Sequence, residues 1–295
     1  MLPEKGTGTE GLAPFYANVQ SHYDLSDDFF ALFLDPSRTY SCAYFEREGM
    51  SLEEAQLAKI DLALGKCDLR PGMTLLDVGC GWGSTMLRAM ERYDVDVIGL
   101  TLSRNQYEHV EGLLEAHRGP RRGRVLLRGW EEFDEPVDRI VSIGAFEHFR
   151  RERYEWFFDK CHRILPADGR MLLHTIVQYN RQELRAKGLP IDREVLAFGR
   201  FIAREIFPGG QLPLPEWVLD YARAAGFDVE RAHSLGPNYV TTLEHWANAL
   251  EKHRDEAIAV TSEEIYDTYS KYLSGCGRFF RDGYIDVVQF SLAKK

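Results

Sequence analysis

The stretch Met73–Gly83 (MTLLDVGCGWG) constrains the fold more than any other part of the sequence. An apolar run ends at an acidic residue, Asp77, and is followed by glycines at alternate positions, Gly79, Gly81 and Gly83. Residues 84–93 then place their apolar side chains on one face of a predicted helix. A strand, a glycine turn and a helix can hold an adenosyl group at the carboxyl end of a parallel sheet, because glycines let the backbone approach a ligand closely.

The spacing of the glycines distinguishes between nucleotide ligands. A dinucleotide-binding turn reads GxGxxG and has its acidic residue about 20 residues later. Here the pattern is GxGxG and Asp77 precedes the first glycine, which fits a sulfonium nucleoside without a pyrophosphate. The stretch resembles motif I of the S-adenosylmethionine-dependent methyltransferases. A glycine turn without a ligand is the alternative, but the strand, the acid and the helix all occur in the order that a nucleoside site requires.

The charge balance limits the class of partner. The 295 residues carry a formal charge of −10 and the pI is near 5.5, which argues against a nucleic-acid-binding protein because such surfaces are basic. Two short basic clusters occur at 121–124 and 150–153. They are either solvated loops or a docking site for an acidic carrier or an anionic head group.

The cysteines and the N-terminus indicate a cytoplasmic protein. Five cysteines are scattered through the chain, Cys42, Cys67, Cys80, Cys161 and Cys276. They show neither CxxC nor Cys/His metal-ligand spacing, so we expect reduced thiols and no metal site. The N-terminus lacks the apolar core of a signal peptide, and no apolar stretch reaches the roughly 18 residues of a membrane-spanning helix.

Short apolar runs that alternate with helical patterns predict an α/β fold. Besides 73–78, strands are expected at 95–100, 124–128, 137–143, 170–177, from 227 onward and at 285–292. The predicted fold is a seven-stranded, mostly parallel, doubly wound sheet of the class I methyltransferase type. Residues 1–14 are expected to be a disordered leader, and 15–295 are expected to form a single domain.

Helical insertions near 178–214 and 241–281 are predicted to form a lid and an acyl channel. Residues 194–207 have an apolar face broad enough to line a cavity. The region 243–280 is expected to contain two helices. These insertions exceed ordinary connections between strands and helices.

Two segments before the glycine turn are also predicted to be helical. Residues 19–34 carry Phe29, Phe30, Phe33 and Leu34 at helical spacing. This face either docks on the core or covers the cofactor. Ser51 and Glu54 form a capping-box pattern that opens a helix extending to about Gly65.

The second and third strands end in residues that a nucleoside site could use. Ordinary methyltransferases end the second strand with Asp or Glu, whose carboxylate binds both ribose hydroxyls, but Thr101 stands there. Gln106 either supplies a compensating contact or forms a capping box with Ser103. Trp130, just past the third strand, either covers an adenine or fills the core.

Glu147 and His174 lie at the carboxyl ends of two further predicted strands, where α/β enzymes hold their reactive groups. A lone strand histidine is often a satisfied core residue, and a Glu-His pair at a strand end can cap a helix. Together with the glycine turn, the two residues indicate an active site. The sequence has no Ser-His-Asp order, phosphate loop or metal-ligand spacing that would indicate another chemistry.

A set of motifs spread over the chain indicates a family. They are YSCAYF (40–45), LLDVGCGWG (75–83), GLTLSRNQ (99–106), GWEEF (129–133), IGAFEHF (143–149), LLHTI (172–176), IFPGG (206–210) and YLSGC (272–276). From about residue 15 to its end, the chain resembles the cyclopropane mycolic acid synthases, the short relatives of cyclopropane fatty-acyl-phospholipid synthase. The phospholipid enzymes have an extra N-terminal domain. Its absence favours a long unsaturated acyl chain on an acyl carrier protein over a bilayer lipid.

The resemblance implies two sets of site residues. S-adenosylmethionine would be bound by Tyr40, Ser41, Leu75, Leu76, Asp77, Val78, Gly79, Cys80, Gly81, Trp82, Gly83, Thr101, Leu102, Ser103, Gln106, Trp130 and Glu131. A bicarbonate ion would be held by the backbone of Cys42 and Ile176 and by Glu147, His174 and Tyr239. Cys276 matches a cysteine that is sometimes assigned as catalytic in this family, although the reaction needs no thiolate and the surrounding sequence shows no feature that lowers the pKa of a thiol.

The implied reaction closes a cyclopropane ring. An alkene carbon takes a methyl group, which leaves a carbocation, and a base such as bicarbonate removes a proton from the new methyl group. The site must exclude water, and the aromatic faces of Tyr23, Tyr40 and Phe146 could stabilise the cation.

Other readings of the sequence remain. Relatives that add water to form a hydroxylated methyl branch carry Glu where Gly144 stands and depart from LLHTI, so Gly144 and His174 favour ring closure. A methyltransferase for another lipid is a further alternative. A methyltransferase for a polar molecule does not fit the apolar helix at 194–207. A binding module without activity would not need Glu147, His174 and Tyr239 together.

Overall fold

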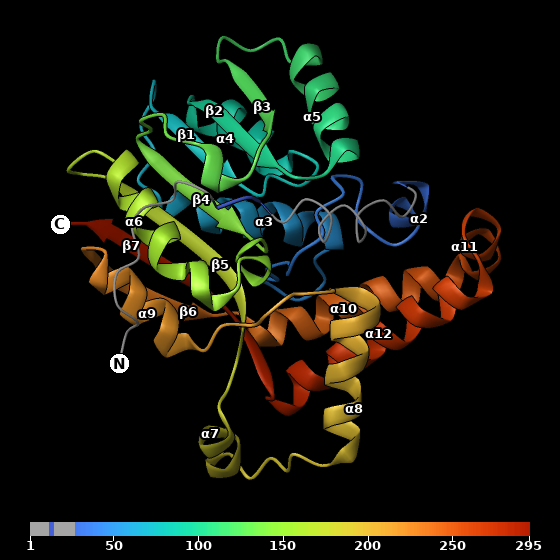
Figure 1. The fold of residues 1–295 in the computed structure, drawn as a ribbon. Coiled ribbons are helices and arrows are strands. Elements are labelled where there is room, and N and C mark those ends of the chain that lie inside the picture. The colour runs from blue at the N-terminus through green and yellow to red at the C-terminus, as the bar shows by residue number, and fades with distance from the viewer. Residues whose placement is uncertain (1–11, 15–26) are drawn as a thin grey trace.

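The computed structural model describes residues 12–14 and 27–295. Its centre is a seven-stranded sheet in the order β3-β2-β1-β4-β5-β7-β6 (Figure 1). The strands are β1 (Thr74–Val78), β2 (Asp96–Thr101), β3 (Gly123–Leu127), β4 (Arg139–Ile143), β5 (Arg170–Gln178), β6 (Phe227–Ser234) and β7 (Ile285–Lys294). Strands β1 to β5 run parallel, and β7 lies antiparallel between β5 and β6. The predicted α/β fold with a mostly parallel sheet is therefore confirmed.

Helices cover both faces of the sheet, which explains why β1 reads as an uninterrupted apolar run. Leu75 packs in the core formed with α3 (Leu52–Gly65), α4 (Ser84–Tyr93) and α5 (Arg104–Ala116). Leu76 packs in the opposite core, formed with α6 (Tyr154–Ile164) and α9 (Pro215–Ala224). Because successive side chains of a strand point to opposite faces, both cores are filled, and polar groups gather at the carboxyl ends of the parallel strands.

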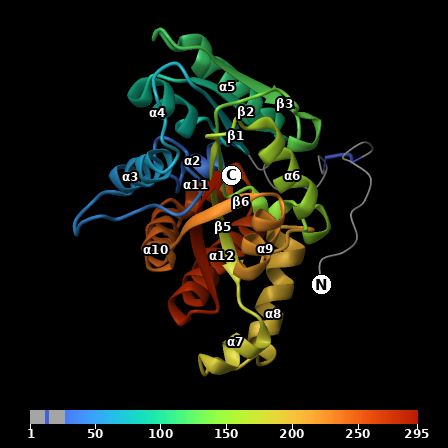
Figure 2. The same ribbon diagram turned by 90° about the vertical axis from the view of Figure 1, so that its left-hand side faces the viewer.

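A third group of helices begins beside the β5-β7-β6 part of the sheet and extends away from it (Figures 1 and 2). It comprises α7 (Arg181–Ala186), α8 (Arg193–Phe201), the π-helical turn η4 (Ile202–Ile206), α10 (Gly236–Lys252), α11 (Arg254–Val260) and α12 (Glu263–Asp282). Helices α10 and α12 pack against each other and against β7. None of the helices in residues 27–295 combines the length and the apolar character needed to cross a membrane.

The prediction of two helices in 243–280 is wrong, because the structure has three helices in this region. The Ser262 hydroxyl accepts a hydrogen bond from the N–H of Ile265 and caps α12, which separates α12 from α11. Helix α10 also begins earlier than predicted, at Gly236, since a proline is tolerated in the first turn, where its missing N–H costs nothing.

The aromatic segment before the glycine turn is helical only in part. Residues 15–26 lie outside the described part of the chain, and α2 spans Asp27–Ala31. Phe30 is buried, and its ring centroid lies 5.6 Å from that of Trp82 and 5.3 Å from that of Tyr40. The segment therefore docks on the core and also packs beside the glycine turn. The prediction of a leader at 1–14 and of a single domain remains a prediction.

The predicted capping box at the start of α3 is confirmed. The N–H of Glu54 donates to Ser51 Oγ at 3.1 Å, and the N–H of Ser51 donates to Glu54 Oε2 at 2.8 Å. We expect Ser51→Ala to lower the free energy of unfolding by about 1 kcal/mol, because the helix-end N–H of Glu54 loses its hydrogen-bond acceptor. Urea denaturation measures this change. Ser274→Ala is the matched control, since that exposed hydroxyl only bonds carbonyls within α12. An equal loss in both variants would contradict a capping role.

Candidate active site

The three glycines after β1 serve different purposes. All have positive φ angles, +82° at Gly79, +55° at Gly81 and +86° at Gly83. A Cβ on Gly79 would lie 2.4 Å from Ala145 Cβ, and one on Gly83 would lie 3.0 Å from a methyl group of Val110. A Cβ on Gly81 would meet no described atom within 4 Å. Packing therefore requires Gly79 and Gly83, whereas Gly81 borders open space.

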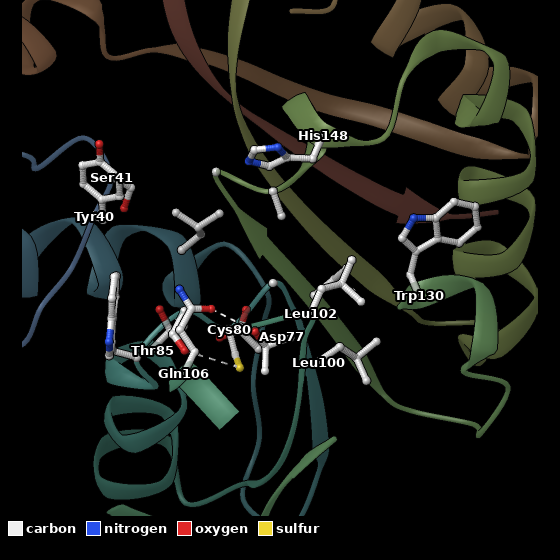
Figure 3. Close-up of a pocket in the computed structure, with 18 of the residues that line it drawn as sticks. Tyr40, Ser41, Asp77, Cys80, Thr85, Leu100, Leu102, Gln106, Trp130 and His148 are labelled. Carbon is white, nitrogen blue, oxygen red and sulfur yellow. Dashed lines mark hydrogen bonds between the residues drawn. The ribbon is translucent and has the colours of Figure 1, made fainter. Parts of the chain in front are cut away.

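That open space is a cavity at the carboxyl ends of β1, β2 and β4. Figure 3 shows Asp77, Cys80 and Gln106 close together, with Trp130 on one side and Tyr40 on the other. Asp77 is buried, and burial raises the pKa of its carboxyl group to about 7 despite the opposing effect of Lys59. A carboxyl group at the end of β1 is therefore available to bind a polar part of a ligand.

Lys59 reaches this cavity from α3. Its ammonium group is almost fully buried and donates to Ser41 Oγ at 2.8 Å. Burial lowers the pKa of Lys59 to about 8, and the nearby acidic groups, including Asp77, act in the opposite direction. Beside it, the Gln56 side-chain amide donates to the carbonyl of Ser41 at 2.8 Å. Helix α3 thus fixes both the side chain and the backbone of Ser41.

Two roles were considered for Gln106, a contact with the ligand and a capping box with Ser103, and the structure at the end of β2 bears on both. Ser103 Oγ accepts from the N–H of Gln106 at 3.3 Å and caps α5. The reciprocal bond of a capping box is replaced, since the N–H of Ser103 donates to Thr101 Oγ1 at 3.1 Å. Thr101 Oγ1 in turn donates to Gln106 Oε1 at 2.8 Å, and this side chain lines the cavity (Figure 3). The Gln106 side chain is thus held at the end of β2 by Thr101, the residue that stands where the ribose-binding acid would be expected.

Trp130 packs in the core and also lines the cavity, so its placement agrees with core filling and leaves its contact with an adenine a prediction. Its ring packs against Phe149 and Phe157, with centroid distances of 5.7 and 5.3 Å, and it also lines the cavity. Its buried indole N–H has no hydrogen-bond partner within the described residues. The carboxylate of the neighbouring Glu131 accepts a hydrogen bond from Arg153, whose Nη1 lies 2.7 Å from Glu131 Oε1. An aromatic wall with one free donor suits a purine ring.

A second cavity adjoins the first. It has a volume of about 380 Å³, against about 130 Å³ for the first. Apolar residues of α8, η4 and α12 form much of its wall. The two cavities share four residues, Tyr40, Ser41, Gly144 and His148. We call these four residues the shared wall. Groups bound in the two cavities would lie close to each other at this wall.

The second cavity contains every residue predicted to be catalytic: Cys42, Glu147, His174, Ile176, Tyr239 and Cys276. Glu147 Oε1 accepts from the N–H of Ile176 at 2.6 Å, whereas Glu147 Oε2 is buried with no hydrogen-bond partner in the described residues. His174 Nδ1 lies 3.2 Å from Gln289 Nε2, and His174 Nε2 is also buried without such a partner. Two unsatisfied polar atoms in a buried site indicate a polar ligand.

Burial determines the charge of these groups. It raises the pKa of the Glu147 carboxyl to about 7 and holds the pKa of His174 well below its usual value. It also lowers the pKa of His148 to about 4 and raises that of the Cys276 thiol to about 12. Both histidines are therefore neutral near pH 7 and the thiol is protonated, which argues against a nucleophilic cysteine.

Comparison with known proteins identifies the family of this chain. The family described as Mycolic acid cyclopropane synthetase matches residues 12–290. The chain belongs to this family. It is 61% identical to Cyclopropane mycolic acid synthase 3 of Mycobacterium tuberculosis over 283 residues, which cover 96% of this chain and 99% of that protein. The prediction of an S-adenosylmethionine-dependent methyltransferase of the cyclopropane synthase type is therefore confirmed at the level of the family.

Solved structures agree with this family. The cyclopropane synthase MmaA2 from Mycobacterium tuberculosis superimposes with a TM-score of 0.96 at 60% identity, covering 96% of this chain and all of that one. The mycolic acid cyclopropane synthase CmaA1, complexed with SAH and CTAB, gives a TM-score of 0.94 at 61% identity, covering 96% and 99%. Coclaurine N-methyltransferase, at 24% identity and a TM-score of 0.78, shows the shared fold alone.

The predicted cofactor-binding residues mostly line the first cavity of this synthetase-family chain. Those that do are Tyr40, Ser41, Asp77, Val78, Gly79, Cys80, Gly81, Trp82, Thr101, Leu102, Gln106, Trp130 and Glu131. Leu75 and Leu76 instead fill the two cores, Gly83 precedes α4, and Ser103 caps α5. These four residues are therefore not part of the lining of the first cavity.

Two further expectations need adjustment, and a third concerns a residue outside the described part of the chain. Phe146 is buried in the core against Tyr154, so its ring is not available to a cation in either cavity. Tyr23 lies outside the described residues. The N–H of Ile176, predicted to bind bicarbonate, donates to Glu147. In the part of the chain that the structure describes, no cluster of His, Cys, Asp and Glu is placed to hold a metal ion.

Lys59 and Gln289 were not predicted from the sequence as residues of the site. Both are fully buried polar residues within otherwise ordinary helix and strand patterns. Most lysines and glutamines lie at the surface, so single-sequence patterns give no signal for them. His148 was also not assigned to the wall between the cavities, although it follows Glu147 directly.

Proposed function

We propose that this protein transfers a methylene unit from S-adenosylmethionine to a double bond of a long unsaturated acyl chain, a mycolic acid precursor, and closes a cyclopropane ring. The observation that carries this proposal is the pair of cavities that share Tyr40, Ser41, Gly144 and His148. One cavity has the features of a nucleoside site, and the other is largely apolar but includes a polar cluster, Glu147, His174 and Tyr239, in its lining.

The first cavity fits S-adenosylmethionine. Gly81 leaves room for a ligand beside the backbone, and Trp130 offers an aromatic face with an unpartnered N–H. Asp77 and Gln106 line the same cavity and offer polar atoms that could bind the hydroxyl and amino groups of a nucleoside. The relative CmaA1, at 61% identity, is described in complex with SAH. When bound, S-adenosylmethionine would supply an electrophilic methyl group.

The polar group of the second cavity fits a bicarbonate ion. Glu147 Oε2 is a buried hydrogen-bond acceptor, and the unpartnered Nε2 of His174 lines the same cavity. Tyr239 lies beside them with a pKa that burial holds well above its usual value, so its hydroxyl remains a donor. Bicarbonate has one O–H and two acceptor oxygens, which match this set. Glu147 would accept the O–H of the ion and so raise the basicity of its other oxygens.

The remaining lining residues protect the carbocation that methylation leaves on the acyl chain. A bicarbonate ion held by Glu147 would supply the base for one proton of the new methyl group, and the electron pair of that C–H bond would form the new C–C bond of the ring. The apolar side chains of α8 and α12 keep water out. Tyr40 lies in both linings, and its hydroxyl donates to that of Tyr272 at 3.2 Å, so its ring remains the candidate for cation stabilisation.

Ring closure is favoured over the addition of water. Gly144 lies in the wall shared by the two cavities at a φ of +70°, and a Cβ there would approach Ser41 at 3.8 Å. A glutamate at this position would bring a carboxylate into the shared wall, where it could hold a water molecule. Because residue 144 is a glycine, it adds no carboxylate to the shared wall.

We further propose that the acyl chain is presented on an acyl carrier protein. The basic clusters do not offer many free cations for it, since Arg121 pairs with Asp94 and Arg124 pairs with Glu135. Arg153 pairs with the buried carboxylate of Glu131. The proposal therefore rests on the resemblance. Comparing turnover of one acyl chain as a carrier thioester and as a free acid tests it, and equal turnover would contradict it.

The reaction itself is tested with purified protein, S-adenosylmethionine and an unsaturated long-chain acyl substrate. Mass spectrometry of the product should show the gain of one methylene group together with loss of the alkene, and proton NMR should show cyclopropane signals. A product that gains a methyl group but retains an alkene or carries a hydroxyl would indicate the branch-forming alternative. No turnover on any unsaturated lipid would contradict the proposal.

The channel assignment gives a prediction about chain length. Gly199 in α8 lines the second cavity, and a Cβ there would meet no described atom within 4 Å. We expect Gly199→Leu to lower turnover of the longest chains roughly tenfold, because the added side chain narrows the cavity. Phe201→Trp is the matched control, since Phe201 lies on the same helix but outside this lining, next to Lys271. A series of acyl substrates of increasing length measures the effect. An unchanged preference in Gly199→Leu would contradict the channel.

A further inference from the structure

A row of polar side chains crosses the antiparallel part of the sheet. In the register of the sheet, His174 on β5 lies opposite Gln289 on β7, and Gln289 lies opposite His233 on β6. Directly opposite residues of antiparallel strands place their side chains side by side on one face. The row therefore leads from the second cavity, which His174 lines, toward the half-buried His233 at the sheet edge.

Lys66 connects to this row from the end of α3. Its Nζ lies 2.5 Å from Gln289 Oε1 and 3.0 Å from His233 Nδ1. Lys66 is the C-cap residue of α3 and is half-buried. Gln289 itself is fully buried, so its amide group cannot turn to water for other partners. The orientation of that amide is decided by Lys66 and His174.

The chemistry of a lysine fixes the orientation of the amide. An ammonium group has only donors, so the atom of Gln289 that faces Lys66 must be the carbonyl oxygen. The amide nitrogen therefore faces His174, and its N–H donates to Nδ1 at 3.2 Å. His174 is neutral because it is buried and lies near Lys59 and Lys66. A neutral imidazole whose Nδ1 accepts a hydrogen bond carries its proton on Nε2.

We propose that Lys66 is a positioning residue that acts through Gln289 to hold His174 in the tautomer with its proton on Nε2. The nitrogen in the cavity is then a donor, while Glu147 Oε2 is an acceptor. A bicarbonate ion needs one of each, and the other tautomer would face the ion with two acceptors. This last consequence rests on the proposed function, whereas the tautomer itself does not.

The tautomer can be measured without any substrate. In protein labelled with 15N in its histidines, the two ring nitrogens of His174 have distinct chemical shifts for their protonated and unprotonated states, and His174→Gln identifies the signals. We expect the ε2 nitrogen to be protonated and the δ1 nitrogen to be unprotonated near pH 7. A protonated δ1 nitrogen would overturn the proposal.

Two variants test the part played by Lys66 and Gln289. In Lys66→Met the amide loses its fixed partner, so His174 should become a mixture of both tautomers. Gln289→Glu keeps the shape of the side chain but makes both of its terminal atoms acceptors, one facing Lys66 and the other facing His174. The proton of His174 should then move to Nδ1, where it can donate to the carboxylate that this change introduces. Lys252→Met, at an exposed lysine of α10, is the control and should keep the wild-type spectrum. A Lys66→Met spectrum identical to that of the wild type would overturn the role of Lys66.

The same variants separate this inference from the proposed function. We expect Lys66→Met to raise the KM for bicarbonate about tenfold, the lower end of the effect of removing an outer partner of a ligand-binding histidine. The affinity for S-adenosylmethionine should not change. If the tautomer shifts as expected but turnover is independent of bicarbonate, the inference holds and the bicarbonate part of the proposed function fails. If turnover needs bicarbonate and the tautomer does not shift, the inference fails alone.

Discussion

Replacing Glu147 with glutamine is expected to slow ring closure by about 100-fold or more, the usual cost of removing one oriented polar contact at a reacting centre. The carboxylate of Glu147 is buried, its Oε1 is already bonded to the N–H of Ile176, and only Oε2 is available to the ion. The Glu147→Gln amide can keep the bond from Ile176, but its NH₂ group would then face the bicarbonate O–H with a second donor. Single-turnover kinetics with an unsaturated acyl substrate measure the loss.

Two controls accompany this experiment. Glu152→Gln changes an exposed acid nearby and should leave the rate unchanged. The affinity of Glu147→Gln for S-adenosylmethionine, measured by calorimetry, should remain close to that of the wild type, because Glu147 lies outside the first cavity. Removing bicarbonate from the buffer should slow the wild type and have little further effect on the variant. Near-normal turnover of Glu147→Gln without bicarbonate would show that the proton goes elsewhere.

Because the pKa of Glu147 is raised, the rate of ring closure should depend on pH. Burial brings this pKa to about 7, so the carboxyl is protonated below that pH and ionised above it. Only the ionised form accepts the O–H of bicarbonate. At saturating bicarbonate, the rate should therefore fall as the pH decreases through about 7, and this limb should be absent from Glu147→Gln. A rate that rises toward acid pH would contradict the assignment.

Gly81→Val is expected to weaken S-adenosylmethionine binding by roughly 100-fold or more, which corresponds to about 2.7 kcal/mol. A side chain at Gly81 meets no described protein atom and would project into the space that the ligand needs. Gly79 is a poorer test, because its Cβ would clash with Ala145 and disturb the fold. Isothermal calorimetry measures the affinity, and circular dichroism shows that the variant is folded.

The control for this variant must share its backbone strain. Gly49 also has a positive φ, +80°, and a Cβ there would meet nothing within 4 Å, but it lies outside both cavities. Gly49→Val should lose a similar amount of stability, on the order of 1–2 kcal/mol for a left-handed conformation. Its affinity for S-adenosylmethionine should be unchanged. Equal affinity in Gly81→Val and the wild type would contradict the assignment of the first cavity.

The elements with a local cause were predictable from the amino-acid sequence. The apolar run before Asp77 and the three glycines after it predict β1, the turn and α4, because strand periodicity and positive φ angles depend on neighbouring residues only. The capping box at Ser51 was predictable for the same reason. Glu147 and His174 were predicted together, since the carboxyl ends of parallel strands meet at one edge whatever the order of the strands.

Tertiary structure alone decided the contacts between distant segments. The position of β7 between β5 and β6 brings Gln289 beside His174, and the end of α3 brings Lys66 beside Gln289. The wall shared by the cavities likewise combines Tyr40 and Ser41 with Gly144 and His148 from another part of the chain. Such contacts depend on how separate elements pack, and burial then sets the charge of each group. A single sequence carries no periodic signal for either effect.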